Sequence, residues 1–228
     1  MKVKNIFLGL ALVAFAGATQ GTFKFERVYK LNEKDTYKSK IDVVASMGEI
    51  NVSMNIANTV KKVYDNGDAD IETALSELKV SMGGQEMPAG SSAPPAMSQR
   101  YSKFGESIGE MTGGDEMTSQ MNFFKYARLG VKEPMSVGQT IKISSKDEKK
   151  KEEVSGTVKF ESLTNGIAAL VTELDVKKDG TEKPMHIKMT SSIDAASSKL
   201  EKVVGTVTGV PAEGIDIDSL KFTMERNK

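Results

Sequence analysis

Few residues in this chain of 228 amino acids have side chains that could carry out catalysis. The sequence contains a single histidine, His186, and no cysteine. The lack of cysteine excludes thiolate nucleophiles, disulfide bonds and cysteine zinc sites. A single histidine cannot form a multi-histidine metal site either. The composition therefore predicts neither a cofactor nor a bound metal ion.

One motif has the spacing of a hydrolase nucleophile. Residues 105–109 read Gly-Glu-Ser-Ile-Gly and match G-x-S-x-G, with Ser107 at the position of the nucleophile. That motif works only on a strand–turn–helix above a parallel sheet, with a histidine to accept the proton. No such pattern surrounds Ser107, and His186 alternates with the apolar Met185 and Ile187, which predicts a hydrated position on a strand. We therefore interpret residues 105–109 as a hairpin turn and expect no catalytic residue.

Two clusters of charged residues could bind ions or partners. Asp65, Asp68, Asp70 and Glu72 crowd one segment, and carboxylates at this density can hold Ca²⁺ weakly. Their spacing is not that of an EF-hand, so a solvated turn is the better interpretation. Residues 146–153 mix lysines with acidic residues, which is typical of a hydrated hairpin tip. Contact with anionic lipid or with a partner protein is the alternative for that run.

The overall charge and the first residues indicate where the protein acts. The chain carries 31 Lys and Arg against 31 Asp and Glu, a balance that argues against nucleic-acid binding. Residues 1–18 have the form of a secretory signal peptide: Lys2 and Lys4, an apolar stretch at 6–15, and small residues up to Ala18. The apolar stretch is well short of the roughly 20 residues that span a bilayer. We expect cleavage after Ala18, export to the periplasm or the cell exterior, and no integral membrane span.

The rest of the sequence predicts strands. Apolar residues alternate with polar ones, the period of a half-buried strand. The apolar positions include Ile41, Val43, Ala45, Met47, Val52, Met54, Val158, Phe160, Met185, Ile187, Met189, Leu220, Phe222 and Met224. Residues 36–47 keep this pattern over a length of about 40 Å at about 3.4 Å per residue. Long twisted strands with one apolar face curve, so we predict a mainly β fold: a strongly curved antiparallel sheet, as a half-barrel or open barrel.

The mature chain, residues 19–228, is expected to form a single β domain made of two halves. Each half, at 22–82 and 131–226, contains a lysine-rich strand, a long alternating strand and an Asx-Gly hairpin signal. A duplicated β-meander fits this similarity, and independent strands of similar rhythm are the alternative. A shift in the apolar parity predicts a β-bulge near Ser76.

The link between the halves has a different composition. Residues 83–99 are rich in Gly, Ser and Pro, which predicts a flexible loop without core residues. A short hairpin is expected around Gly105. Met117, Met121 and Phe124 lie at helical spacing, which predicts at most one short helix covering an end of the sheet.

Several features together resemble a group of uncharacterised exported bacterial proteins and lipoproteins. These are the signal peptide, an L-x-x-x-D-x-Y opening at 31–37, the Met-rich strands and the segment 133–140, Glu-Pro-Met-Ser-Val-Gly-Gln-Thr. The group has a P-x-x-V-G-D-x-W segment at this point, and Gln139 and Ile141 depart from it. The expected architecture is similar to that of periplasmic lipoprotein carriers, and this resemblance implies a curved sheet that cups an acyl chain. It transfers no functional residue.

Methionine is abundant on the predicted apolar faces and adapts to flexible ligands, although it also packs ordinary cores. The sequence therefore predicts an exported, non-catalytic binding protein that holds a lipid or another apolar molecule in the curved sheet. The alternative is a structural or protein-interaction module of the cell envelope without a small ligand. The expected ligand-binding residues are Met47, Met54, Met185, Met189, Met224, Phe160 and Phe222.

Overall fold

The computed structural model describes residues 22–87, 94–114, 126, 131–147, 151–180, 183–210 and 217–227. The expected signal peptide and the expected helix at 115–128 lie outside the described residues, apart from Tyr126. The strands are β1 (Lys34–Ala45), β2 (Gly48–Val63), β3 (Ala69–Met82), β4 (Gln85–Met87), β5 (Met97–Tyr101), β6 (Ser107–Gly113), β7 (Thr140–Asp147), β8 (Glu152–Thr164), β9 (Ile167–Lys178), β10 (Met185–Asp194), β11 (Leu200–Thr208) and β12 (Ile217–Arg226).

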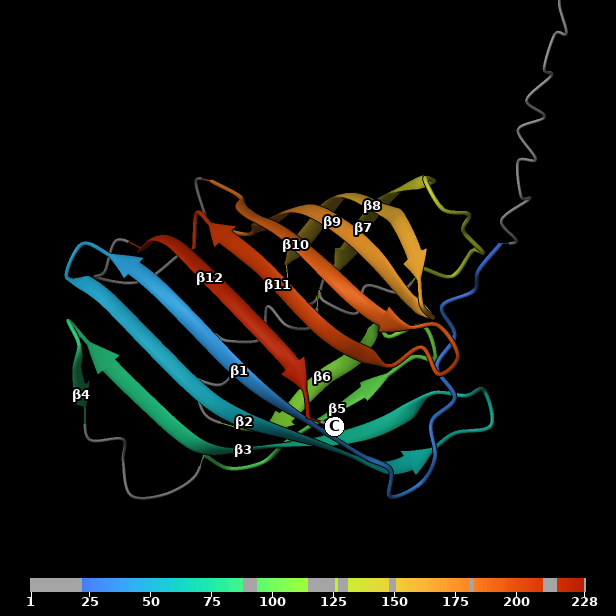
Figure 1. The fold of residues 1–228 in the computed structure, drawn as a ribbon, viewed down its shortest axis with the longest axis horizontal. Helices are drawn as coiled ribbons and strands as arrows, with labels where there is room; N and C mark the ends of the chain where they lie inside the picture. The colour runs from blue at the N-terminus through green and yellow to red at the C-terminus, as the bar shows by residue number, and fades with distance from the viewer. Residues whose placement is uncertain are drawn as a thin grey trace, which may run out of the picture.

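All these strands belong to one antiparallel sheet of 12 strands, in the order β6-β5-β3-β2-β1-β12-β11-β10-β9-β8-β7, with β4 paired to β3. Figure 1 shows this sheet strongly curved, with β1 and β12 side by side in its middle. Strands β6 and β7 form the two ends of the path and do not pair with each other, so the sheet stays open. The structure confirms the predicted mainly β fold as a curved, open antiparallel sheet.

Within the sheet, the strands of the first part of the chain lie on one side of β1, and the strands of the second part lie on the other side. Strands β1, β2 and β3 follow one another as a meander, and β7 to β12 form a second meander that ends beside β1. None of the described residues forms a helix long and apolar enough to cross a membrane.

Alternating burial follows the period of two in the sequence. In β1 the outward Lys40 is exposed, whereas the inward Ile41 is only 2% exposed. A register shift between β2 and β3, with Glu77 at a φ of 52°, forms a bulge where the parity of the apolar residues changes. The predicted bulge near Ser76 is confirmed.

Two expectations about the turns and loops are wrong in part. Met47 lies in the turn between β1 and β2 and is 52% exposed, because strand β1 ends at Ala45 before the alternation does. Residues 83–99 do not form a single loop: β4 and the start of β5 pair with β3, and Gln99 is buried. The side-chain amide of Gln99 donates to the carbonyl of Ile108, so this residue joins β5 to the expected hairpin with β6.

The N-terminal segment, residues 22–33, runs along one end of the sheet (Figure 1). It begins with a pair of backbone hydrogen bonds between Phe23 and Met135. The amide of Arg27 then donates to the carbonyl of Lys103, and that of Asn32 to the carbonyl of Val60. The segment therefore ties the two halves of the chain together at this end.

Candidate functional site

The inner, apolar face of the sheet is built from rows of side chains that cross neighbouring strands. The strand register defines two adjacent rows through the middle of the sheet. The first contains Met54, Ser39, Met224, Val203, Ser191, Leu170 and Phe160. The second contains Val52, Ile41, Phe222, Gly205, Met189, Thr172 and Val158.

The structure brings most of the expected ligand-binding residues together on these rows. Met54, Met224 and Phe160 share the first row, and Met189 and Phe222 share the second. All five are buried, with exposed fractions of 1–5%. Met185 and Met47 lie apart from them.

Met185 is half-buried at the start of β10 and packs against the edge of the same core. Met47, in the exposed turn, is not part of this face, so its predicted position on the apolar face of a strand is wrong. The inner face therefore contains fewer of the expected residues than the sequence alone predicted.

One position in the second row has no side chain, and an aromatic ring covers it. A Cβ atom added at Gly205 would lie 2.6 Å from Cζ of Phe222 and 2.7 Å from Cβ of Met189. Glycine at this position lets the Phe222 ring lie directly over the backbone of β11.

A few polar side chains interrupt the apolar face. Ser39, Thr172 and Ser191 are only 1–4% exposed. The Ser39 hydroxyl has no hydrogen-bond partner in the described part of the chain. Buried polar groups without a partner are uncommon in folded proteins.

A small cavity lies where the N-terminal segment meets the inner face. Its volume is about 40 Å³. Three residues of the N-terminal segment line it: Phe25, Arg27 and Tyr29. The other lining residues are Lys103, Phe104, Gly105, Leu170, Thr172, Ser191, Ile193, Ser198 and Leu200. The cavity therefore joins both rows of the inner face through β9 and β10.

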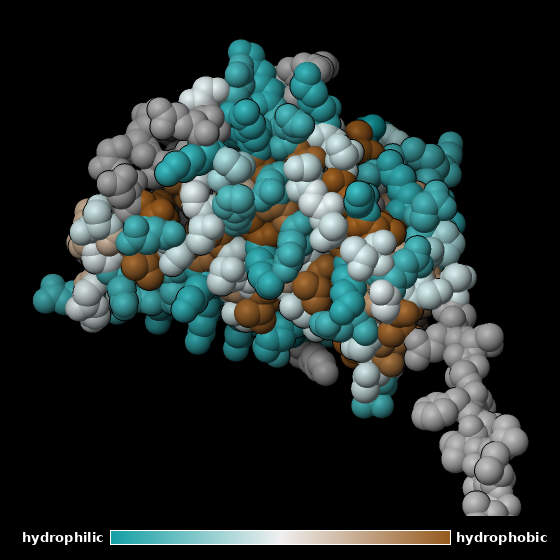
Figure 2. Space-filling model, turned by 90° about the horizontal axis from the view of Figure 1, so that it is seen from above, coloured by the Kyte–Doolittle hydropathy of each residue, from teal (hydrophilic) through white to brown (hydrophobic). Residues whose placement is uncertain are grey.

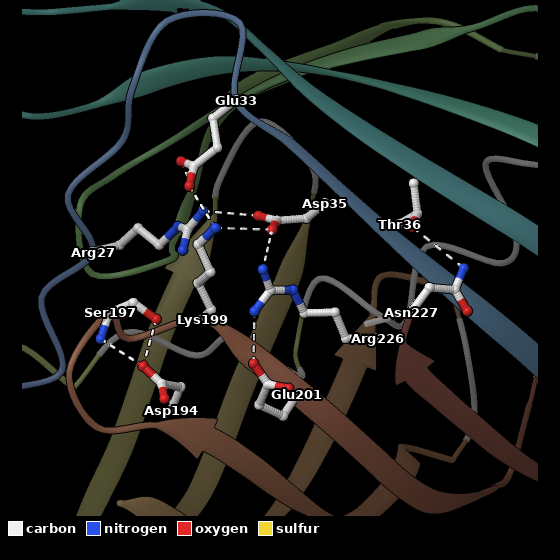
Figure 3. A network of polar contacts seen from close by, with 10 residues as sticks. All are labelled: Arg27, Glu33, Asp35, Thr36, Asp194, Ser197, Lys199, Glu201, Arg226 and Asn227. Atoms are coloured by element: carbon white, nitrogen blue, oxygen red, sulfur yellow. Dashed lines mark hydrogen bonds and ion pairs between the residues drawn. The ribbon is translucent and has the colours of Figure 1, made fainter.

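Arg27 forms part of a network of buried and half-buried ion pairs beside this cavity (Figure 3). Its Nη2 atom donates to Oδ2 of Asp35 at 2.8 Å and to Oε2 of Glu33 at 3.1 Å. Lys199 and Arg226 each approach Oδ1 of Asp35 at 3.1 Å. Asp35 is 7% exposed, and these three cations compensate the burial of its carboxylate.

The network extends toward the C-terminus through Arg226. Its Nη1 atom lies 2.7 Å from Oε1 of Glu201. Burial alone would lower the pKa of Arg226, but the bond to Glu201 and the charge of Asp35 outweigh this effect and raise it. Nearby, the Asp194 carboxylate accepts bonds from the hydroxyl and the amide of Ser197, which hold its pKa below the ordinary value.

A second polar contact joins Tyr126 to the edge of the core. Tyr126 is 5% exposed, and its hydroxyl donates to Oε1 of Glu152 at 2.8 Å. Burial, together with the negative charge of Glu152, raises the pKa of this tyrosine. The hydroxyl therefore stays protonated and serves as a donor.

The candidates for catalysis or metal binding do not come together. Ser107 starts β6 on an antiparallel hairpin, whereas His186 lies in β10 with its side chain exposed and paired with Asp175. The described residues contain no group of three or more His, Asp or Glu side chains placed to hold a metal ion.

Two of the acidic residues near the β2–β3 turn, Asp70 and Glu72, have separate partners. Asp70 accepts bonds from Tyr64 at 2.7 Å and from Arg100 at 3.0 Å, and Glu72 pairs with Lys61. Burial acts to raise the pKa of Asp70, but these two bonds prevail and lower it. These carboxylates are used in ion pairs rather than gathered around one point.

The outer face of the sheet is polar. Figure 2 shows hydrophilic side chains over most of one side of the molecule, with hydrophobic residues visible in small areas between them. Two shallow outer grooves have volumes of about 440 and about 450 Å³. Charged residues of neighbouring strands line them, including Lys40 and Lys79 in one and Glu173 and Lys188 in the other.

Sequence reasoning missed Arg27, Thr172 and Ser191. A signal for Arg27 was present, because it alternates with Phe25 and Tyr29 and so falls on an apolar parity. Thr172 and Ser191 also occupy inward parities of their strands, but hydroxyl residues occur on either face of a sheet. No protein-family model matches this sequence, and no curated protein matches it.

Proposed function

We propose that this protein is an exported, non-catalytic binding protein that holds an apolar ligand, such as an acyl chain, against the inner face of its curved sheet. The observation that carries the proposal is the composition of the two inner rows. Met54, Met189 and Met224 lie near the middle of an apolar face in a sheet that is not closed.

Methionine suits a surface that must repack around a ligand. Its unbranched side chain has several rotatable bonds and a polarisable sulfur atom, so it fits irregular apolar shapes. Pockets for apolar ligands combine such a lining with a few polar groups that set orientation. Ser39, Thr172 and Ser191 supply polar groups of this kind on the inner face.

Binding would require the inner face to open. Its side chains are buried against one another, and the cavity at the N-terminal end is too small for an acyl chain. A ligand must therefore displace some of these side chains from one another. An open sheet accommodates such a change more readily than a closed barrel, because no strand hydrogen bonds between β6 and β7 have to break.

The burial of the inner face also favours a second function. A curved sheet whose concavity is filled by its own side chains would serve as a structural or protein-interaction module of the cell envelope. The polar grooves on the outer face would then provide the contact surfaces.

Photo-crosslinking distinguishes these two functions. The full chain is incubated with a long-chain fatty acid carrying a diazirine in its chain, irradiated and digested, and the modified residues are mapped by mass spectrometry. We expect modification of inward residues such as Ile187 and Met189, which an excess of unlabelled fatty acid suppresses.

The outward neighbours in the same strand, Lys188 and Thr190, provide a built-in control, because they lie on the opposite face. Modification confined to outward residues, or modification that excess fatty acid does not suppress, would contradict the binding function and favour the interaction module.

A further inference from the structure

The cavity at the N-terminal end has the features of a subsite for one polar group. It lies between the segment containing Phe25 and Tyr29 and the inner side of β9 and β10. Its volume of about 40 Å³ compares with about 150 Å³ for a cavity that binds benzene. It can therefore accept a group the size of a carboxylate but no part of a long chain beyond it.

Arg27 supplies a charged donor at this cavity. The residue is 8% exposed, and Nη2 is fixed by Asp35 and Glu33. The other terminal nitrogen, Nη1, is buried and has no hydrogen-bond partner in the described part of the chain. A buried donor without an acceptor is destabilising, so a ligand oxygen that reached Nη1 through a small shift of the guanidinium would remove this penalty.

The charges around Arg27 limit the kind of ligand group that can supply this oxygen. The network contains equal numbers of cations and carboxylates: Arg27, Lys199, Arg226, Glu33, Asp35 and Glu201. Because these charges already balance, each negative charge that a ligand brings is left uncompensated, and a singly charged group costs less than a doubly charged group such as a phosphate monoester. Arginine binds a carboxylate particularly well, through charge-assisted hydrogen bonds.

The position of the cavity connects it with the proposed ligand face. Leu170 and Ser191 belong to the first inner row and Thr172 to the second, and all three line the cavity. A ligand with its polar end in the cavity would therefore extend its chain along the rows toward Met224 and Met189.

We propose that this cavity binds the carboxylate of a fatty acid, with Arg27 as the charged donor and Thr172 and Ser191 as flanking hydroxyl groups. This inference rests on the proposed function, because it assigns the polar end of the same apolar ligand.

The first test uses the wild-type full chain and four probes. The affinities of dodecanoate, methyl dodecanoate, dodecanol and acetate are measured by calorimetry or by displacement of a fluorescent fatty acid. We expect dodecanoate to bind roughly tenfold more tightly than its methyl ester or the alcohol, because only the carboxylate brings its own negative charge to the hydrogen bond with Arg27. Acetate should bind far more weakly, since it lacks the chain.

The second test uses variants. Arg27→Lys should weaken dodecanoate binding roughly tenfold and leave the methyl ester nearly unaffected, since a lysine cannot reproduce the planar set of donors. Thr172→Val, which keeps the shape of the side chain, should have a smaller effect in the same direction. Arg226→Lys is the matched control, because it alters the same ion network away from the cavity lining and should leave the preference for dodecanoate unchanged.

Equal affinities of the wild type for dodecanoate and its methyl ester would overturn the inference while leaving the proposed function intact, since Nη1 would then be satisfied by water. Acetate that binds as tightly as dodecanoate would also overturn it, because the chain would contribute nothing. If no probe with a chain binds the wild type, the proposed function fails and this inference fails with it.

Discussion

Substitution of Gly205 by alanine tests whether the inner face is packed as tightly as the structure indicates. The added Cβ would lie 2.6 Å from Cζ of Phe222, 2.7 Å from Cβ of Met189 and 2.8 Å from the carbonyl oxygen of Lys188. Carbon atoms in contact normally stay about 3.5–4.0 Å apart. The Phe222 ring could shift, but the carbonyl and the Cβ atom belong to a strand paired with β11 and cannot move alone.

The expected magnitude follows from two opposing effects. Overpacking of a core typically costs about 1–3 kcal/mol of unfolding free energy. Replacing glycine by alanine also restricts the unfolded chain, which stabilises the protein by about 0.4–1 kcal/mol. We therefore expect Gly205→Ala to lower the stability by about 1–2 kcal/mol.

Urea denaturation followed by circular dichroism measures this change as a lower midpoint with an unchanged m value. Thr206→Val is the control, because the neighbouring side chain points outward and should alter the stability by less than about 0.5 kcal/mol. In a double-mutant cycle, Phe222→Leu should recover part of the loss, since it removes the ring that the new methyl group contacts. A Gly205→Ala protein as stable as the wild type would refute the close packing of this row.

Other substitutions test the strand parity and the polar contacts. Phe160→Ala should cost about 3–5 kcal/mol and Lys159→Ala less than about 0.5 kcal/mol in the same urea assay, and comparable losses would mean that β8 is assigned to the wrong register. Asp35→Ala should cost about 3–5 kcal/mol, because it leaves the buried Arg27 and two half-buried cations without their shared carboxylate; a loss below about 1 kcal/mol would show that the network is hydrated. The bonds from Ser197 lower the pKa of Asp194, so its stabilising effect should be complete above the unfolded pKa of about 3.9 and disappear as the pH falls through the lower folded value. Asp194→Asn should therefore destabilise the protein at pH 7 and have a progressively smaller effect as the pH falls below about 3.9, and an effect that does not change with pH would contradict this role.

The period of two in the sequence was sufficient to predict the curved sheet and most of its inner face. It separates Ile41 from Lys40 and Phe160 from Lys159, because successive side chains of a strand point to opposite faces. The same rule gave a wrong position for Met47, since alternation in the sequence does not show where a strand stops pairing. The hairpin turn after Ala45 sets the end of β1.

Composition was a weaker guide than periodicity in the link between the halves. Residues 83–99 have the glycine and proline content of a loop, yet Gln99 is buried and joins β5 to β6. The pairing of β5 with β3 determines this placement, and such contacts between distant segments leave no local pattern.

The cavity at the N-terminal end could not be predicted for the same reason. Arg27 is separated by more than 140 residues from Thr172 and Ser191 in the chain, and only the curvature of the sheet brings them to one cavity. Its charge is compensated by Asp35 in β1, and that carboxylate also pairs with Lys199, which lies just before β11. A lone arginine on an apolar parity indicates a buried charge but not its function.

Native mass spectrometry of the protein purified from its own host tests the central claim most directly. If the inner face is a ligand site, part of the population should carry a non-covalent adduct with the mass of a fatty acid or another lipid, and delipidation should remove it. The bare chain as the only species, with no adduct after incubation of the protein with excess fatty acid, would contradict a ligand-binding function for the curved sheet.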